Sequence, residues 1–193
     1  MENNTRLKSQ SSSNLQLATF GGGCFWCTEA IFKRVEGVVS VESGYSGEDM
    51  ANPGYSDVSS GSTGHAEAVQ IEFDPSIVSF STLLEIFWVT HDPTTLNKQG
   101  NDVGTQYKSI IFYYNDEQKK LAEKSKADEE YGLDRKVVTQ ITPFQHFYKA
   151  EKYHQNYYDK NQNYPYCSFI IAPKVKKLLE KFGDKVKEEY KNT

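Results

Sequence analysis

The sequence predicts one globular domain in which β-strands and helices alternate. The chain has 193 residues, enough to bury a sizeable core without dividing into several domains. Segments with period-two alternation of apolar residues interleave with segments in which apolar residues recur every three or four positions. Beyond the first fifteen residues the composition shows no strong internal shift. We therefore expect residues 15–193 to form a single domain.

The composition excludes several classes of partner. The formal net charge is −4, and the 22 basic residues are mixed with 26 acidic ones, so we expect no basic face for nucleic acid or anionic lipid. Residues 1–14 are rich in Ser, Asn and Gln and lack both the apolar core of a secretion signal and a membrane-spanning segment, which predicts a disordered tail. Three cysteines do not suit a disulfide scaffold. We expect a cytoplasmic protein with no membrane partner.

The first half of the chain is predicted to contain three strands, one helix and a long loop. Residues 15–20 form a short apolar run typical of a strand, and apolar residues after Cys24 recur at helical spacing, so a helix begins there. Residues 38–45 and 65–74 predict two further strands. The segment between them, 46–64, is crowded with Gly, Ser and Asn and is predicted to be a loop. Loops of this length inside a compact domain tend to be functional.

The second half continues the alternation. Residues 79–90 carry apolar side chains at helical spacing and predict an amphipathic helix, and residues 107–114 predict a fourth strand. A surface helix is expected over 115–130 and a further strand over 136–141. Pro173 suits the first turn of a last helix, whose apolar stripe lies opposite a row of lysines.

A glycine run precedes the most reactive residue type in the chain. Gly21, Gly22 and Gly23 lead directly into Cys24 at the expected start of a helix. Unpaired backbone N–H groups and the positive end of the helix dipole favour an anionic sulfur there, and glycines allow a substrate to approach. The pattern predicts a nucleophilic thiolate with a lowered pKa. The alternative is a small buried hydrophobic residue, the commoner role of a lone cysteine.

A second cysteine, Cys27, makes a C-x-x-C pair with Cys24. Such a pair in a reducing compartment indicates either a redox dithiol or half of a zinc site. Zinc needs four ligands, and the sequence has no second C-x-x-C and only singly scattered histidines. Redox chemistry without a metal is therefore favoured. No nucleotide cofactor is expected either, because the glycine run lacks the G-x-G-x-x-G spacing.

Glu67 is the second informative residue. Under period-two alternation its carboxyl lies on the apolar face of the strand predicted at 65–74. Burial disfavours the charged form, which raises the pKa of such a carboxyl and lets it donate a proton near neutral pH. The alternative is a solvated position at the end of the strand. Tyr55 in the long loop and Tyr107 at the start of the fourth strand are candidates for further O–H donors, and ordinary packing is the alternative for each.

The motifs together resemble a known family. They are Gly23-Cys24-Phe25-Trp26, Asn52-Pro53 followed by Tyr55, Gly64-His65-Ala66-Glu67-Ala68, Phe87-Trp88, His91-Asp92-Pro93, and Gln99-Gly100-Asn101-Asp102 followed by Gly104-Thr105-Gln106-Tyr107. In this order they resemble peptide-methionine (S)-S-oxide reductase, the methionine sulfoxide reductase A family, over residues 18–172. The combination is highly specific.

The resemblance implies both a fold and an activity. The fold would be an α+β two-layer sandwich with a mixed β-sheet, flanking helices and a ferredoxin-like core, making 15–193 a single catalytic domain. The activity would be the reduction of methionine S-sulfoxide, free or in proteins, as part of protein repair under oxidative stress. The family uses no cofactor. Its reductant is thioredoxin, which acts after a disulfide has formed in the enzyme.

The resemblance and the chemistry of the residues agree on a mechanism. The Cys24 thiolate would attack the sulfoxide sulfur, while Glu67 as general acid, with Tyr55 and Tyr107 as hydrogen-bond donors, would protonate the oxygen. Methionine would leave, and Cys24 would remain as a sulfenic acid that a nearby thiol converts to a disulfide and water.

Three further residues would bind the substrate. In the family the aromatic pair after the nucleophile cradles the methyl group, a role that falls to Phe25 and Trp26. An apolar wall beside a polar one can distinguish two epimers at sulfur. Asp102 matches a family position that helps to bind substrate, and its alternative role is a loop-capping turn.

The resolving thiol is where the sequence departs from the commonest family pattern. Many members have Gly where this chain has Cys27, and its tail lacks a glycine-rich stretch with a terminal cysteine. In a regular helix the Cβ atoms of Cys24 and Cys27 lie about 5–6 Å apart, whereas a disulfide needs roughly 3.5–4.5 Å, so a tightened first turn would be required. The other resolving candidate, Cys167, ends an aromatic segment that runs on from Thr142 and aligns loosely with a tail cysteine of other family members. The apolar run after it predicts a strand and burial, but Cys167 could still take the disulfide in a second step. We expect Cys27 to resolve the sulfenic acid first.

Two other functions remain open from the sequence alone. A general dithiol-disulfide oxidoreductase would use Cys24 and Cys27 but would need no proton donor such as Glu67. A non-catalytic binding module with an aromatic pocket would tolerate serine at position 24.

Overall fold

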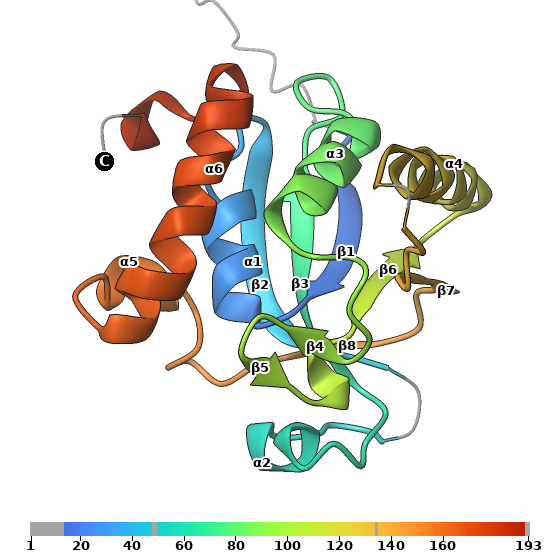
Figure 1. Ribbon diagram of the computed structural model, residues 1–193, viewed down its shortest axis with the longest axis vertical. Helices are drawn as coiled ribbons and strands as arrows, with labels where there is room; N and C mark the ends of the chain where they lie inside the picture. Colours follow the sequence, from blue (N-terminus) through green and yellow to red (C-terminus); the bar gives the residue numbers. More distant parts are fainter. Residues whose placement is uncertain (1–13, 48–49, 134, 192–193) are drawn as a thin grey trace, which may run out of the picture.

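The computed structural model describes residues 14–47, 50–133 and 135–191 (Figure 1). The tail predicted at 1–14 therefore lies outside the described residues, apart from Asn14. In the part of the chain that is described, no helix is long and apolar enough to cross a membrane.

A six-stranded mixed sheet forms the centre of the molecule, with the order β7-β6-β1-β3-β2-β8. Its strands are β1 (Gln16–Gly22), β2 (Val38–Ser46), β3 (Ala66–Phe73), β6 (Ser109–Tyr113), β7 (Gln140–Pro143) and β8 (Phe147–Lys149). Every neighbouring pair is antiparallel except β6 and β7, which are parallel. Two short strands, β4 (Lys98–Gln99) and β5 (Asp102–Val103), pair with each other outside this sheet.

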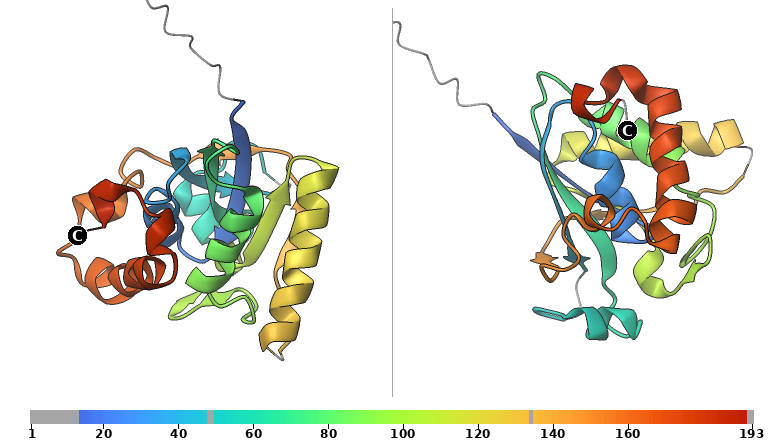
Figure 2. Two further views of the ribbon diagram at one scale, coloured as in Figure 1. Left: turned by 90° about the horizontal axis from the view of Figure 1, so that it is seen from above. Right: turned by 90° about the vertical axis from the view of Figure 1, so that its left-hand side faces the viewer.

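The helices make the fold α+β, as the sequence predicted. They are α1 (Phe25–Phe32), α2 (Tyr55–Ser59), α3 (Phe80–Thr90), α4 (Asp116–Leu133), α5 (Tyr157–Lys160) and α6 (Ala172–Phe182), with short 3₁₀ or π turns at Thr105–Tyr107, Cys167–Ile171, Gly183–Lys185 and Glu188–Tyr190. Helix α1 packs on β1, β2 and β3, and α6 packs against both α1 and α3. Seen along the sheet, α1 and α6 lie on the same side of it (Figure 2).

The main core lies between the sheet and these helices, and it fixes the end of β1. Phe20 is fully buried, with its ring 5.1 Å from that of Phe87 on α3 and 5.4 Å from that of Phe32 on α1. Such ring pairs add to the burial of large apolar surface. Because these contacts hold β1 against α1 and α3, the residues that join β1 to α1 have a defined position.

Two glycines, one near the end of β1 and one just after it, are required by the geometry of this connection. A Cβ at Gly21 would lie 2.9 Å from the backbone oxygen of Glu67, so β1 and β3 approach closely there. Gly23 has φ +93°, and a Cβ on it would lie 2.6 Å from Cγ of Gln99. Only glycine combines this backbone conformation with so little space.

Several predicted boundaries differ from the structure. The predicted loop 46–64 contains the short helix α2. The strand predicted at 107–114 begins at Ser109, because Tyr107 lies in a 3₁₀ turn whose N–H bonds to the carbonyl of Gly104. The strand predicted at 136–141 is β7, which begins only at Gln140.

The prediction of a strand after Cys167 is wrong, because that segment is helical. Residues Cys167–Ile171 form a π turn that runs into α6. Its buried members, Cys167 and Ile171, continue into the buried Val175 and Leu178 of α6, a spacing that belongs to a helix. Phe169, by contrast, is 77% exposed. The apolar run was therefore one turn of an amphipathic helix.

Candidate active site

Cys24 is the N-cap residue of α1 and is 8% exposed. The first turn after it is tight: the N–H of Cys27 donates to the Cys24 carbonyl at 3.1 Å, whereas the N–H of Thr28 lies 3.5 Å from the same oxygen. The shorter bond is of the 3₁₀ type. The tightened turn brings Cys27 toward Cys24, and the two thiols are hydrogen-bonded to each other. All three cysteines, with Cys167, are free thiols.

The lowered pKa predicted for Cys24 is not found in this state. Burial raises the pKa of the Cys24 thiol, and the neighbouring Cys27 and Glu67 raise it further. The local reason is that the N–H of Phe25, the first of the helix, donates to Oε2 of Glu67 at 3.0 Å. The backbone N–H that was expected to stabilise the Cys24 sulfur thus donates its hydrogen bond to the Glu67 carboxyl instead.

Cys27 is the more acidic member of the thiol pair. Its hydrogen bond with Cys24 lowers the pKa of Cys27 to about 7, and the positive charge of Lys174 on α6 contributes in the same direction. The two thiols therefore titrate as a coupled pair.

Glu67 is buried, at 3% exposure, near the start of β3. Burial raises the pKa of its carboxyl to about 8, while the hydrogen bond from Phe25 acts in the opposite direction. The prediction of a buried carboxyl with a raised pKa is confirmed, and the solvated alternative is wrong. At neutral pH most of Glu67 is protonated and can donate a proton.

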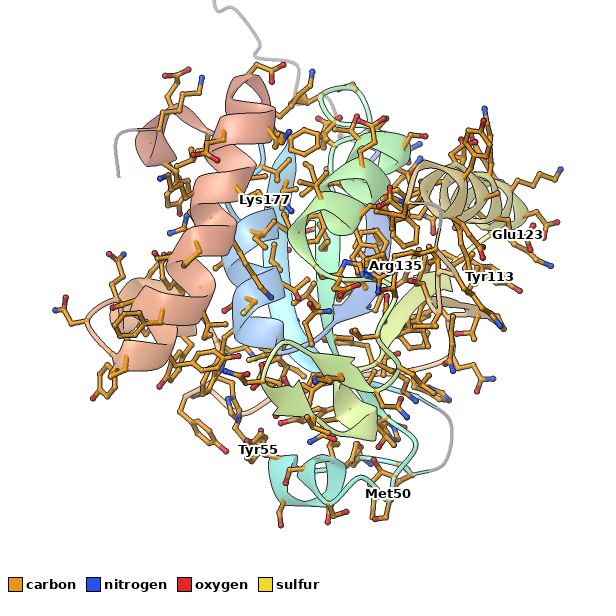
Figure 3. The ribbon with its side chains drawn as sticks, in the orientation of Figure 1. Met50, Tyr55, Tyr113, Glu123, Arg135 and Lys177 are labelled. Carbon is orange, nitrogen blue, oxygen red and sulfur yellow. The ribbon has the colours of Figure 1, made fainter. Side chains whose placement is uncertain are left out.

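Both predicted tyrosines lie within electrostatic range of this carboxyl. Tyr55 begins α2 at one end of the molecule (Figure 3), and its ring lies 4.8 Å from that of His154. Tyr107 ends the 3₁₀ turn that precedes β6. Burial raises the pKa of both phenols, and the charges of Glu67 and Cys24 raise them further. Both hydroxyls therefore remain protonated donors.

Phe25 and Trp26 have different environments. Phe25 is 1% exposed and belongs to the core, whereas Trp26 is only partly buried. The indole of Trp26 stacks on the ring of Tyr157 with 3.6 Å between centroids and 5° between planes. Its N–H donates to Nδ1 of His154 at 3.0 Å. Neither Tyr157 nor His154 was predicted from the sequence to lie at the site.

Asp102 is held beside the thiols by Tyr166, which was also not predicted from the sequence. The hydroxyl of Tyr166 donates to Oδ2 of Asp102 at 2.6 Å and contacts the thiols of both Cys24 and Cys27. The ring of Tyr166 meets that of Trp26 edge-on at 5.8 Å. Tyr166 is one of thirteen tyrosines, and its only distinguishing signal is its place directly before a cysteine.

Cys167 is fully buried at the start of the π turn. Burial raises the pKa of its thiol, and the nearby charge of Cys27 raises it further. Cys27 therefore raises the pKa of both other thiols, Cys24 and Cys167.

A metal site is not found among residues 14–47, 50–133 and 135–191, where no group of three or more His, Cys, Asp and Glu side chains could hold an ion.

Comparison with known proteins identifies the family to which the chain is similar. Residues 16–186 match the family described as peptide methionine sulfoxide reductase. The peptide methionine sulfoxide reductase MsrA of Saccharolobus solfataricus is 58% identical over 173 residues, which cover 90% of this chain and 98% of that protein. MsrA of Sulfolobus acidocaldarius is 59% identical over 171 residues, with 89% and 97% covered.

Solved structures resemble the chain as well. Reduced Mxr1 from Saccharomyces cerevisiae superposes with a TM-score of 0.74 at 35% identity, covering 79% of this chain and 89% of Mxr1. Mxr1 in complex with Trx2 gives 0.52 at 25% identity, with 79% and 91% covered. Given the match over most of its length and the identity to these relatives, the chain belongs to the peptide methionine sulfoxide reductase family.

Proposed function

We propose that this enzyme reduces methionine S-sulfoxide, free or within proteins, at Cys24, and that thioredoxin restores the thiols. The observation that carries the proposal is the combination at the start of α1: a free thiol at Cys24 and a buried Glu67 whose pKa of about 8 keeps it protonated at neutral pH. A nucleophile beside an acid suits attack on sulfur with transfer of a proton to oxygen.

Residues of this chain supply every proton and electron that the reductive step needs. With Cys27 in its thiolate form, which its pKa of about 7 makes available, Cys24 passes its proton to the Cys27 sulfur and attacks the sulfoxide sulfur. Glu67 protonates the oxygen, and Tyr55 and Tyr107 donate hydrogen bonds to it. The sulfur–oxygen bond of the substrate breaks, so methionine leaves reduced and Cys24 becomes a sulfenic acid.

The aromatic and polar sides of the site account for the choice of epimer. Trp26, stacked on Tyr157, offers an apolar wall for the methyl group, with Phe25 packed behind it. Asp102, held by Tyr166, binds the polar part of the substrate. Only one configuration at sulfur directs the methyl group to the wall and the oxygen to the acid.

The thiols are then regenerated in sequence. The Cys27 thiol attacks the Cys24 sulfenic acid, giving a disulfide and water; the tight first turn and the thiol–thiol hydrogen bond support this order. Cys167 can take over the disulfide in a second step. Two electrons and two protons from a dithiol then restore the thiols, and the complex of the related Mxr1 with Trx2 supports thioredoxin as that dithiol.

The test is a single turnover of the purified protein without reductant on each epimer of methionine sulfoxide. The S epimer should release methionine and the R epimer should not. Equal rates for the two epimers would overturn the proposed stereochemistry, and release from neither would overturn the activity.

The same proposal includes the finer fold assignment and the location. Strand order β6-β1-β3-β2, with α1 joining β1 to β2 and α3 between β3 and β6, supports a ferredoxin-like core. We also propose that residues 15–193 are one catalytic domain and that the protein works in the cytoplasm, where its three thiols would stay reduced.

A further inference from the structure

A buried carboxylate on α1 binds the backbone of the segment that carries Tyr157. Glu29 is 3% exposed; its Oε1 accepts the N–H of Asn156 at 2.8 Å and its Oε2 lies 3.4 Å from the N–H of Tyr157. Asn156 has φ +56°. This conformation costs free energy for a non-glycine residue, so it persists because its surroundings hold it. We call residues 154–157 the clamp segment.

The two residues that follow α1 bind the same part of the chain. Lys33 donates to Oδ1 of Asn156 at 2.5 Å and forms an ion pair with Asp159 at 2.8 Å. Arg34, which is buried, also pairs with Asp159 at 2.6 Å. Glu29 and Lys33 therefore bind the clamp segment directly, and the two ion pairs fix Asp159 just after it.

The clamp segment in turn sets the position of Trp26. Glu29 lies three residues after Trp26, so the two side chains project from adjacent parts of one helical face. The clamp segment contacts Trp26 at both ends, through the hydrogen bond to His154 and the parallel stack with Tyr157. Glu29 bonds to the backbone of the clamp segment rather than to either thiol of the Cys24–Cys27 pair.

We propose that Glu29 is a positioning residue for substrate binding: it holds the clamp segment so that Tyr157 and His154 fix the Trp26 indole as the wall that receives the substrate's methyl group. The inference rests on the proposed function. It adds a residue that acts through Tyr157 rather than on the reacting atoms, and it predicts an effect on binding rather than on the chemical step.

Glu29→Gln tests the proposal because it keeps the shape of the side chain. An amide has one acceptor oxygen, so its NH₂ group would face one of the two backbone N–H groups. The KM for methionine S-sulfoxide should rise about tenfold, as expected for a lost hydrogen bond to a charged group, while the single-turnover rate at saturating substrate stays unchanged. Glu123→Gln, on the exposed side of α4 (Figure 3), is the matched control and should change neither value.

A double-mutant cycle distinguishes positioning from general destabilisation. If Glu29 acts through Tyr157, then Glu29→Gln should add no further rise in KM to a Tyr157→Ala protein. Additive effects, or a fall in the single-turnover rate at unchanged KM, would overturn the proposal. Should Glu29→Gln fail to fold, Glu29→Asp, which keeps the charge but shortens the side chain, should give the same rise in KM.

A measurement without substrate separates this inference from the proposed function. Trp26 and Trp88 are the two tryptophans of the chain, so fluorescence in a Trp88→Phe background reports on Trp26 alone. Acrylamide should quench it more strongly after Glu29→Gln, and equal quenching would overturn the positioning role. If the parent protein reduced no sulfoxide, the proposed function would be wrong. The quenching experiment would still test whether Glu29 positions Trp26 through the clamp segment.

Discussion

At the scale of single residues, the hydrogen bond from the N–H of Phe25 bears on the pKa values of both Cys24 and Glu67. It donates to Glu67 rather than to sulfur, so burial dominates at Cys24 and the pKa of its thiol rises. The same burial raises the pKa of Glu67 to about 8. On the proposed mechanism, Glu67 is the acid at the helix start and Cys24 must lose its proton to a neighbour. Cys27, whose pKa is lowered to about 7, is the proposed acceptor of that proton.

Glu67→Gln should slow the reductive step by roughly 10² to 10⁴, the usual contribution of a general acid. The raised pKa sets the pH window: the acid form is complete well below pH 8 and is lost as pH rises through that value. Single-turnover methionine release should therefore decline above a pH of about 8 in the parent enzyme. In the variant this decline should be absent. An unchanged rate in Glu67→Gln across neutral pH would make Tyr55 and Tyr107 the leading donors.

Tyr166→Phe should make the thiols less acidic. The Tyr166 hydroxyl, which otherwise donates to Asp102, lowers the pKa of Cys24 or Cys27 when it donates to that sulfur instead, and phenylalanine keeps the ring without the donor. The pH at which a small alkylating reagent reaches half its maximal rate should move upward. Tyr164→Phe, at an exposed tyrosine two residues earlier, is the control and should leave that pH unchanged; an equal shift in both variants would contradict the assignment.

At the scale of elements, the turn between β1 and α1 requires glycine at position 23. Gly23→Ala combines a positive φ with a Cβ 2.6 Å from Gln99, so it should lower the free energy of unfolding by roughly 2–4 kcal/mol. Urea unfolding measures this directly. Gly132→Ala provides the contrast, because a Cβ there meets nothing within 4 Å near the end of α4. It should stabilise the protein by about 0.5–1 kcal/mol. Equal effects at both sites would contradict the account.

On the proposed mechanism, the first turn of α1 makes Cys27 the resolving thiol. Cys27 lies one tight turn from Cys24, whereas Cys167 is buried in the π turn before α6. Cys27→Ser should still release one equivalent of methionine, but more slowly because the base that accepts the Cys24 proton is lost, and should then accumulate a trappable sulfenic acid and lose thioredoxin-driven cycling. Cys167→Ser should cycle nearly normally. If instead Cys167→Ser alone stopped cycling, Cys167 would be the resolving thiol.

At the scale of the whole molecule, residues close in sequence were predictable and distant contacts were not. Alternation and helical spacing located β1, α1, β3 and α3, and alternation alone indicated the burial of Glu67. The partners of Trp26 were not predictable, because His154 and Tyr157 lie about 130 residues away, at and just before the start of the short helix α5. The helical turn at Cys167–Ile171 was missed because its exposed Phe169 is apolar, whereas only the position of α6 shows which residues face the core.

The central claim is that Cys24 takes the oxygen of methionine S-sulfoxide, and the most direct measurement uses a protein in which Cys24 is the only cysteine. Cys27→Ser/Cys167→Ser, given substrate without reductant, should release one equivalent of methionine per chain, more slowly than the parent protein because Cys27 no longer accepts the Cys24 proton. Peptide mass mapping should then find one added oxygen atom on Cys24, trapped as a sulfenic acid adduct. The same protein with Cys24→Ser should release none. Methionine release by the Cys24→Ser protein, or oxygen found on any other residue, would contradict the account.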